Sequence, residues 1–449
     1  MVYYNPWQAE WGSRPDFTAW GSSMKKIGSL LSLFVLLVGL AACTDIPATT
    51  PATSQPAQTE PAGSTRTPRP TATLTPPVFQ GSISIWHSWD EAQLPALLEI
   101  IAGFQETYPG ILFDVLYVPA ANLLPRYTQA ASEGGGPALV LAPAEGGPDL
   151  FERDLVADLS GSVPDELLQR LSPPALGAAQ YHAALIGVPY SQRGVVLYRN
   201  RRIIPERPET LADLIQLSQT FTEGEQIGAI LERAPYYAGG HLFGFGGSFL
   251  DADGNPMFNT PAGLAWVELL QTFAQAGPPD YFTDNDLDLF SQARVGFVIG
   301  GTWNRFALAE AIGEDFLEID PWPVHDQGAL MGFVQTDNLF LNTNTSDAGR
   351  GLAALFIAHM LSDSTQMRLG ESGLIPVVQV SLEDKLANQA LTALAGGVAY
   401  PIQPEFSAFL LPLDQALLSV FDSGVPADQA LLTAEEAVRN ALANLTPTP

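Results

Sequence analysis

From residue 80 onward, the apolar and polar positions follow the two periods of regular secondary structure. In GSISIWHSW (81–89), Ile83 and Ile85 lie on one face of an alternating pattern, which predicts a strand. LPALLEIIAGFQETYPG (94–110) has apolar residues at helical spacing and stops at Pro-Gly, which predicts a helix. ILFDVLYV (111–118) and the apolar run ALVLAP (138–143) predict two further strands, with a helix over 122–134 between them.

This order of strand, helix, strand, helix and strand predicts an α/β fold with a parallel sheet and right-handed crossovers. In open sheets of that kind, ligands lie beyond the carboxyl ends of the strands. The loops at those ends read WHSWDE (86–91) and APAEGGPD (142–149), so we expect a binding site to include them.

The rest of the body continues the alternation of strands and helices. Residues 185–203 predict two short strands that flank a Pro-Tyr-Ser loop, and the polar turn in GSFLDADGNPMF (247–258) predicts a hairpin. RVGFVIGGTWNRFAL (294–308) predicts a strand, a glycine turn and the start of a helix. Further helices are expected over 209–221, 260–277, 405–424 and 427–442.

The N-terminal part has a different pattern, because an uncharged apolar run begins after Lys25 and Lys26 and ends in LAAC at Cys43. A positive start, an apolar stretch and small residues are the order of a secretory signal peptide, which we place at 24–42. The ending LAAC resembles the bacterial lipobox, in which the cysteine becomes the first mature residue and is acylated. A transmembrane anchor is the alternative, since the run is near the lower limit for spanning a membrane.

Two flanking segments are left out of the predicted fold. We interpret residues 1–23 as an upstream extension that results from a mis-assigned start codon. The alternative is that these residues are a genuine N-terminal extension with a role of their own. Residues 43–79 are mostly Thr, Pro, Ala and Ser, and such a segment cannot bury enough surface to offset the entropy of ordering. We expect a disordered linker that tethers the folded body to Cys43.

The composition excludes several classes of protein. The 449 residues carry a formal net charge of −28, which argues against binding to nucleic acid. The single cysteine excludes an internal disulfide and a zinc site built from several cysteines. HExxH, P-loop and GxSxG motifs are absent. Asp284, Asp286 and Asp288 could bind calcium, but a solvated loop is the favoured interpretation, and we expect neither metal nor cofactor.

Several spaced segments resemble the extracytoplasmic solute-binding proteins of ATP-driven importers, in the branch of maltose- and other sugar-binding proteins. The resemblance spans residues 80–445. Each segment alone is weak evidence for the family, whereas the order of all of them behind a lipobox and a linker is specific to it. The segments are ISIWHSW (83–89), FQETYPGILFDV (104–115), LYRNRRIIPERPETLADL (197–214), FNTPAGLAWVELL (258–270), GFVIGGTWNRF (296–306), PEFSAFLLPLDQAL (404–417) and SGVPADQAL (423–431).

The resemblance implies a two-lobe α/β fold of the periplasmic-binding-protein type (type II). Each lobe is then a mainly parallel sheet flanked by helices, and a hinge joins the lobes. Lobe one is expected to comprise 80–190 and 334–388, and lobe two 194–330 and 389–445. The crossings between the lobes are expected near Tyr190, Phe333 and Ala387.

The same resemblance implies a function. The protein would be a monomeric, extracytoplasmic binding protein, not an enzyme, anchored to the cell membrane by lipid on Cys43. It would capture a sugar or oligosaccharide between its lobes and deliver it to the transmembrane subunits of an ABC permease. The alternatives are a polyamine, peptide, phosphonate or metal-chelate ligand, a sensory protein that docks on a receptor kinase, and a surface glycan hydrolase. A hydrolase would need two carboxylates at a set separation across one cleft.

Three residues are the strongest candidates for contacts with a sugar, whose ring faces favour aromatic side chains and whose hydroxyls favour polar ones. Trp303 matches the Gly-x-Trp turn of the family, whose tryptophan stacks on sugar. Tyr190 matches a tyrosine beside the hinge that contacts ligand. Glu145 lies where the family has an acidic or polar residue that accepts sugar hydroxyl bonds. The alternatives are a buried Trp, hinge packing and an exposed loop glutamate, respectively.

The loop after the first strand supplies three further candidates, His87, Ser88 and Trp89. Trp89 is favoured over Trp86, because Trp86 continues the alternation of the strand. Asn304 adds an amide beside Trp303.

Two departures from the family pattern argue against maltodextrin itself as the ligand. Leu410 lies where oligosaccharide binders often place a second stacking tryptophan, and lobe one lacks an obvious lysine partner for a carboxylate at the first loop. Tyr236, Tyr237 and Phe245 are the aromatic residues that we expect to replace the lost surface.

Overall fold

A computed structural model describes residues 79–278 and 285–444 of the chain. The expected signal peptide, Cys43, Asp284 and nearly all of the linker lie outside the described residues. Within the described ranges, no helix is long and apolar enough to cross a membrane.

The first lobe begins with the expected β-α-β series. Strand β1 (Gly81–His87) pairs in parallel with both β2 (Ile111–Tyr117) and β3 (Leu139–Pro143). The helices α1 (Leu94–Thr107) and α2 (Ala120–Ser132) form the crossovers between these strands. The sequence pattern therefore predicted this part of the sheet and its parallel pairing correctly.

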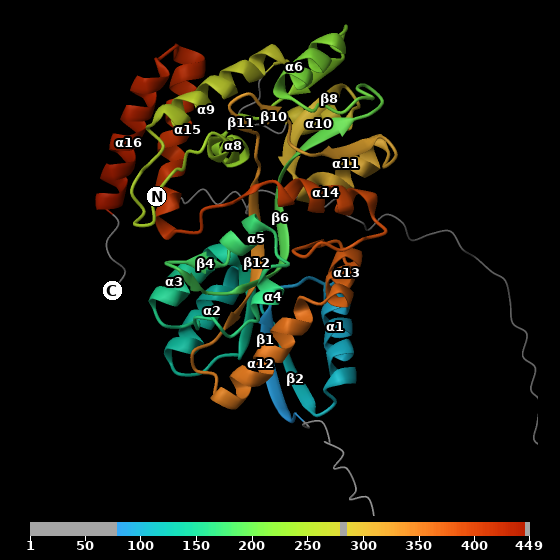
Figure 1. The fold of residues 1–449 in the computed structure, drawn as a ribbon, viewed down its shortest axis with the longest axis vertical. Helices are drawn as coiled ribbons and strands as arrows, with labels where there is room; N and C mark the ends of the chain where they lie inside the picture. Colours follow the sequence, from blue (N-terminus) through green and yellow to red (C-terminus); the bar gives the residue numbers. More distant parts are fainter. Residues whose placement is uncertain (1–78, 279–284, 445–449) are drawn as a thin grey trace, which may run out of the picture. The chain divides into compact units, whose positions relative to one another are not determined.

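The lobes are joined by two long antiparallel strands, β6 (Val188–Asn200) and β12 (Phe333–Leu341), and β6 is drawn between the lobes in Figure 1. The N-terminal half of β6 pairs with β12, and β12 also pairs with β3, whereas from Val195 onward β6 pairs with strands of the second lobe. The change of partners occurs next to Gly194, so the ladder continues from one lobe into the other.

The expectation of two short strands around a Pro-Tyr-Ser loop is wrong, because β6 is one strand of 13 residues. Its register with β12 shifts between Asp337, which faces Ser191, and Asn338, which faces Pro189. Tyr190 is the extra residue of this β-bulge. A bulge lets a strand continue past an irregular position, here a proline that cannot donate a ladder hydrogen bond.

The second lobe builds its own sheet on the C-terminal half of β6. Strands β8 (Val295–Gly301) and β9 (Leu317–Asp320) pair with β6 in antiparallel fashion, and β7 (Ile227–Ile230) pairs in parallel with β8. The buried side chain of Arg199 bonds Asp320 through Nε at 2.6 Å and Nη2 at 3.0 Å, which ties β6 to the edge strand β9.

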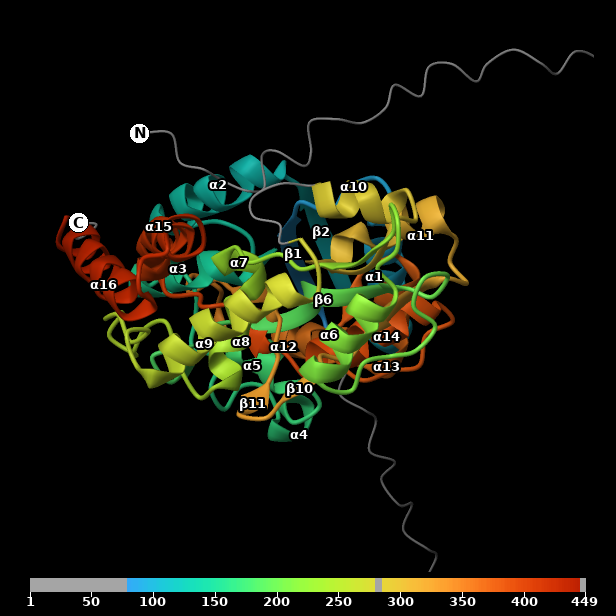
Figure 2. The same cartoon turned by 90° about the horizontal axis from the view of Figure 1, so that it is seen from above.

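Each lobe has a separate hydrophobic core. In the first lobe, β1 and β3 pack with α1, α12 (Asp347–Met360) and α13 (Asp363–Glu371). In the second lobe, the core joins α9 (Pro261–Thr272) to the two C-terminal helices, α15 (Ser407–Ser423) and α16 (Ala427–Ala443), which pack side by side (Figure 2).

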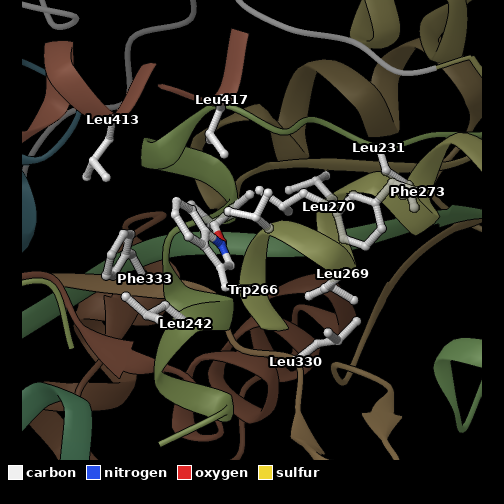
Figure 3. Packing of buried hydrophobic residues seen from close by; sticks show 14 of the residues in the cluster. Leu231, Leu242, Trp266, Leu269, Leu270, Phe273, Leu330, Phe333, Leu413 and Leu417 are labelled. Atoms are coloured by element: carbon white, nitrogen blue, oxygen red, sulfur yellow. The ribbon is translucent and has the colours of Figure 1, made fainter. Parts of the chain in front are cut away.

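Trp266 lies at the centre of the second core, with Leu242, Leu417 and Phe333 around it (Figure 3). Its indole nitrogen donates to the carbonyl oxygen of Ala238 at 2.9 Å, so the buried N–H has a partner. Phe333 opens β12, and its side chain therefore anchors the crossing strand in the core of the second lobe.

The last crossing lies in the C-terminal third. Strand β13 (Ile375–Pro376) pairs with the first-lobe half of β6, whereas α14 (Lys385–Ala395) packs against β9 and shares a core with β8. The chain therefore crosses between Pro376 and Lys385, shortly before Ala387, which lies inside α14. After it, β14 (Val398–Ala399) pairs with the start of β12.

The remaining elements are short or peripheral. They are η2 (Ala144–Gly146), α3 (Gly147–Glu152), α4 (Asp165–Leu168), α5 (Pro173–Gly177), β4 (Gln180–Tyr181), β5 (Ala184–Leu185), α6 (Leu211–Thr220), α7 (Pro235–Ala238), α8 (Gly240–Gly244), η3 (Phe273–Gln275), α10 (Asn285–Ser291), η4 (Thr302–Asn304), α11 (Arg305–Ile312), β10 (Val324–His325), β11 (Gly328–Ala329) and η5 (Pro404–Phe406).

A substitution at Gly194 tests how closely the crossing strands approach. A Cβ on this residue would lie 2.3 Å from the carbonyl oxygen of Phe333, and backbone atoms cannot move aside as a flexible side chain can. We expect Gly194→Ala to lower the free energy of unfolding, measured in urea, by about 1–3 kcal/mol.

The matched control is Gly351→Ala on α12, where the added Cβ would meet no atom within 4 Å. This variant should keep or gain stability, because alanine is the better helix former by about 1 kcal/mol. Equal losses of stability in the two variants would contradict a close approach at Gly194.

Candidate functional site

Side chains from both lobes meet where the crossing strands pass between them. Glu145 comes from η2, directly after the carboxyl end of β3, where parallel sheets place ligand-binding groups. Tyr236 comes from α7 in the second lobe, and Gln335 lies on β12 between them. We call these residues, together with Arg193, Asp337, Tyr237, Trp303 and Tyr400, the seam.

A chain of hydrogen bonds crosses the seam. The hydroxyl of Tyr236 donates to Oε1 of Gln335 at 2.8 Å, and the amide nitrogen of Gln335 donates to Oε1 of Glu145. Gln335 is buried, so it holds one residue of each lobe at the floor of the seam. This chain of hydrogen bonds links η2 of the first lobe to α7 of the second.

The second carboxylate oxygen of Glu145 has a different environment. Oε2 is closed off from solvent and has no hydrogen-bond partner among the described residues. Desolvation raises the pKa of Glu145, while the charge of Arg193 and the bond from Gln335 act in the opposite direction. A buried acceptor without a donor costs about 1–3 kcal/mol, so a donor from a ligand would be stabilising here.

Arg193 and Asp337 form an ion pair across the β6–β12 ladder. Nη1 of Arg193 lies 2.8 Å from Oδ1 of Asp337, and the hydroxyl of Ser191 donates to Oδ2 at 3.2 Å. Burial by itself lowers the pKa of the Arg193 guanidinium, but Asp337 and Glu145 outweigh it and raise that pKa. Arg193 therefore stays charged at the floor of the seam.

Aromatic rings form the second-lobe side of the seam, with Tyr236 at their centre. The centroid of its ring lies 5.2 Å from that of Tyr237, 5.9 Å from that of Tyr400 and 6.4 Å from that of Trp303. All four side chains are partly exposed, and Tyr400 follows directly after β14. The cluster offers apolar ring faces next to the polar groups of Gln335 and Glu145.

The turn that carries Trp303 is linked to the crossing strands. The backbone N–H of Gly194 donates to the hydroxyl of Thr302 at 3.2 Å, and the hydroxyl of Tyr198 donates to the carbonyl oxygen of Gly301 at 2.7 Å. Asn304 closes the turn, because its side-chain oxygen accepts from the N–H of Gly301 at 3.1 Å. The expected amide is therefore present, and its oxygen is engaged in the turn.

The candidates from the first loop lie in the core of lobe one. His87, Trp89 and Tyr190 have 1%, 5% and 3% of their surface exposed, whereas Ser88 is partly exposed. Nε1 of Trp89 donates to the hydroxyl of Tyr190 at 3.0 Å, and Nδ1 of His87 accepts from the backbone N–H of Trp89 at 3.1 Å. Desolvation lowers the pKa of His87.

Tyr190 borders the seam without pointing its hydroxyl to solvent. Burial raises the pKa of Tyr190 well above its ordinary value, and the nearby charge of Asp337 acts in the same direction. The structure thus groups these candidates into two sets. Glu145, Trp303 and Tyr237 lie at the seam. Trp89 and Tyr190 pack against each other in the core of the first lobe.

Sequence reasoning missed Arg193, Gln335, Asp337 and Tyr400 as seam residues. Charged or amide side chains inside two predominantly apolar strands were the available signal for the first three. Tyr400 carried no such signal, since its place follows only from the pairing of β14 with β12.

Two cavities lie away from the seam. One of about 580 Å³ is in the second lobe and is lined by Arg199, Arg201, Arg207, Glu318 and Asp320, among others. The other, of about 220 Å³, is in the first lobe between Leu159 and Arg350. Within the described part of the chain, no group of three or more His, Cys, Asp or Glu side chains is placed to hold a metal ion.

Comparison with known proteins adds an independent result. Residues 99–436, more than half of the chain, match the family described as bacterial extracellular solute-binding protein. The maltotriose-binding protein of Pyrococcus abyssi (strain GE5 / Orsay) is 23% identical over 247 residues, which are 53% of this chain and 52% of that protein. The match therefore spans about half the length of this relative.

Solved structures establish the fold. The extracellular solute-binding protein from Staphylococcus aureus in complex with maltose superposes with a TM-score of 0.74 at 18% identity, covering 82% of this chain and 99% of that one. The cyclic alpha-maltosyl-1,6-maltose binding protein from Arthrobacter globiformis gives a TM-score of 0.71 at 20% identity, covering 81% and 100%. These likenesses confirm the expected two-lobe α/β fold.

The contact between Trp89 and Tyr190 leads to a prediction about stability. Tyr190→Phe would leave the indole N–H of Trp89 buried without an acceptor, which costs about 1–3 kcal/mol. We expect a loss of that size in the free energy of unfolding without ligand. The control Tyr117→Phe, on a side chain that is 53% exposed, should stay within about 0.5 kcal/mol of the parent. Unchanged stability of Tyr190→Phe would show that the bond contributes nothing to the fold.

Proposed function

This chain belongs to the bacterial extracellular solute-binding protein family, and on that premise we propose that it captures a sugar or an oligosaccharide between its two lobes. The relatives described above are binding proteins for maltotriose, maltose and cyclic alpha-maltosyl-1,6-maltose. Carbohydrate is therefore the ligand class that we carry over to this chain.

The observation that carries the proposal is the composition of the seam. The ring of a pyranose has faces rich in C–H groups and a rim of hydroxyls, so it fits aromatic side chains next to hydrogen-bonding groups. Tyr236 combines both, because its ring lies among Tyr237, Tyr400 and Trp303 while its hydroxyl bonds Gln335. Glu145 adds an acceptor from the opposite lobe.

Binding in this arrangement requires the lobes to part and close again. The two lobes have separate cores and share the strands β6 and β12, so bending of these strands would separate Glu145 from Tyr236. A ligand that contacts both sides favours the closed form, because it binds that form more tightly than the open one. Trp303 would follow the motion, since its turn is bonded to Gly194.

We further propose that the protein delivers its ligand to the transmembrane subunits of an ABC permease and is held at the outer face of the membrane by lipid on Cys43. Dual or multiple acylation would give stable attachment, since one acyl chain alone gives only marginal membrane binding. The acidic body gains nothing from an anionic membrane surface, so the anchor would account for its location.

Binding without turnover is the favoured activity. A glycan hydrolase needs a general acid and a second free carboxylate facing one bond. In the seam, Asp337 is engaged by Arg193 and Ser191, which leaves Glu145 as the carboxylate with an unbonded oxygen. Release of a shortened sugar by the purified protein would overturn this part of the proposal.

Thermal unfolding of the full chain against a panel of carbohydrates tests the ligand class. A ligand present at a hundred times its Kd should stabilise the folded state by about 2.7 kcal/mol. We expect one or more sugars to raise the Tm, and amino acids, peptides and phosphonates to leave it unchanged. A rise with one of these solutes and with no sugar would reject the carbohydrate proposal.

Trp303→Ala should weaken binding of the responding sugar at least tenfold, which corresponds to about 1.4 kcal/mol, because the variant removes a ring face of the seam. The control Phe316→Ala removes an exposed ring that stacks on Arg202 and should bind as the parent does. Titration calorimetry gives both affinities. If Trp303→Ala bound normally, the ring would have a structural role only.

A further inference from the structure

The seam holds more negative than positive charge. The carboxylates of Glu145 and Asp337 face the single guanidinium of Arg193, which is bonded to Asp337. These two groups, Arg193 and Asp337, are the charged side chains with the largest effect on the pKa of Glu145. When Glu145 is ionised, one negative charge of the three groups is therefore not compensated within the seam, and burial of this charge raises the pKa of Glu145.

Two more carboxylates lie beside Tyr181, at the edge of the seam, because this side chain packs with Ala144 and Ala399, which directly precede Glu145 and Tyr400. The hydroxyl of Tyr181, on β4 of the first lobe, donates to Oε1 of Glu152. Burial raises the pKa of Tyr181, as do the bond to Glu152 and the charges of Glu152 and Glu405. Glu405 belongs to η5, whose Phe406 is part of the second-lobe core, so this edge also has carboxylates from both lobes.

The excess charge is concentrated where hydrogen bonding is incomplete. Oε1 of Glu145 accepts from Gln335, whereas Oε2 is closed off from solvent and has no hydrogen-bond partner in the described part of the chain. A hydroxyl of a neutral sugar would supply a donor but would leave the negative charge in a site of low polarity. An ammonium group would supply both the donor and the opposite charge, whereas a hydroxyl supplies the donor alone.

The surroundings of Glu145 also fit a cation. Tyr236 and Tyr400 are both close enough for the charge of Glu145 to raise the pKa of their hydroxyls, although burial is the larger cause for each. A positive group beside Glu145 would thus meet a carboxylate on one side and the hydroxyl oxygens of these two tyrosines on the other.

We infer that the ligand is a saccharide that carries a protonated amine, and that its ammonium group binds Oε2 of Glu145 between the lobes. This inference rests on the proposed function and narrows it from sugars in general to amine-bearing sugars. The aromatic cluster holds the sugar ring, and the carboxylate of Glu145 favours ligands that carry a positive charge.

A matched pair of probes separates charge from shape. Maltotriose is compared with its mono-6-amino-6-deoxy derivatives, in which one ammonium group replaces one hydroxyl, and with the N-acetylated forms of these derivatives, which carry no charge. Titration calorimetry uses the full chain. We expect at least one amino derivative to bind ten or more times more tightly than maltotriose, and its N-acetylated form to lose this gain.

Two variants locate the effect. In Glu145→Gln the preference for the amino derivative should fall by tenfold or more, because the negative charge is gone while the side-chain shape is kept. Glu166→Gln removes a carboxylate from an exposed position on α4 and should keep the preference. Loss of the preference in both variants would show a long-range effect of net charge and would overturn the assignment to Glu145.

The outcomes distinguish this inference from the proposed function. If maltotriose binds as tightly as every amino derivative, the inference is wrong and the carbohydrate proposal stands. If neither maltotriose nor any amino derivative binds while the linear polyamine spermidine does, both are wrong. The comparison of probes on the parent protein decides between these outcomes, even where Glu145→Gln fails to fold.

Discussion

The antiparallel ladder of β6 and β12 is the constraint on which the rest of the structure depends. Strand β6 runs from the first lobe into the second, and β12 runs in the opposite direction. Neither lobe can therefore complete its sheet alone. Backbone hydrogen bonding fixes the two strands to each other, while the separate cores leave each lobe a unit of its own. A protein built this way can bend at the ladder without disturbing either core.

The ladder also brings the polar groups of the seam together. Gln335 and Asp337 lie on β12 and Arg193 lies on β6, so the polar floor of the seam is part of the ladder that joins the lobes. The turn of Trp303 is attached to the same place through the bond between Gly194 and Thr302. A bend in the ladder would therefore be transmitted directly to the groups that we propose as ligand contacts, with no intermediate element.

Local patterns in the sequence predicted the parallel strands of the first lobe, the two C-terminal helices and the strand-turn-helix that carries Trp303. They did not predict the continuous β6, because Pro189 is typical of a break and only the bulge at Tyr190 accommodates it. The seam was only partly predicted, since Arg193 and Asp337 are 144 residues apart, and Gln335 and Glu145 are 190 apart. Contacts at such separations follow from topology and leave no local pattern.

The position of β12 in the chain has a consequence for folding. This strand, Phe333–Leu341, lies between β3 and β6 in the sheet, although the chain makes both of those strands much earlier. During synthesis the first lobe must therefore wait, with an open sheet edge on β3, until three quarters of the chain have appeared. Long-range pairing of this kind slows folding and prolongs exposure of unpaired strands. The order of the strands along the chain thus makes completion of the first lobe one of the last steps in forming the sheet.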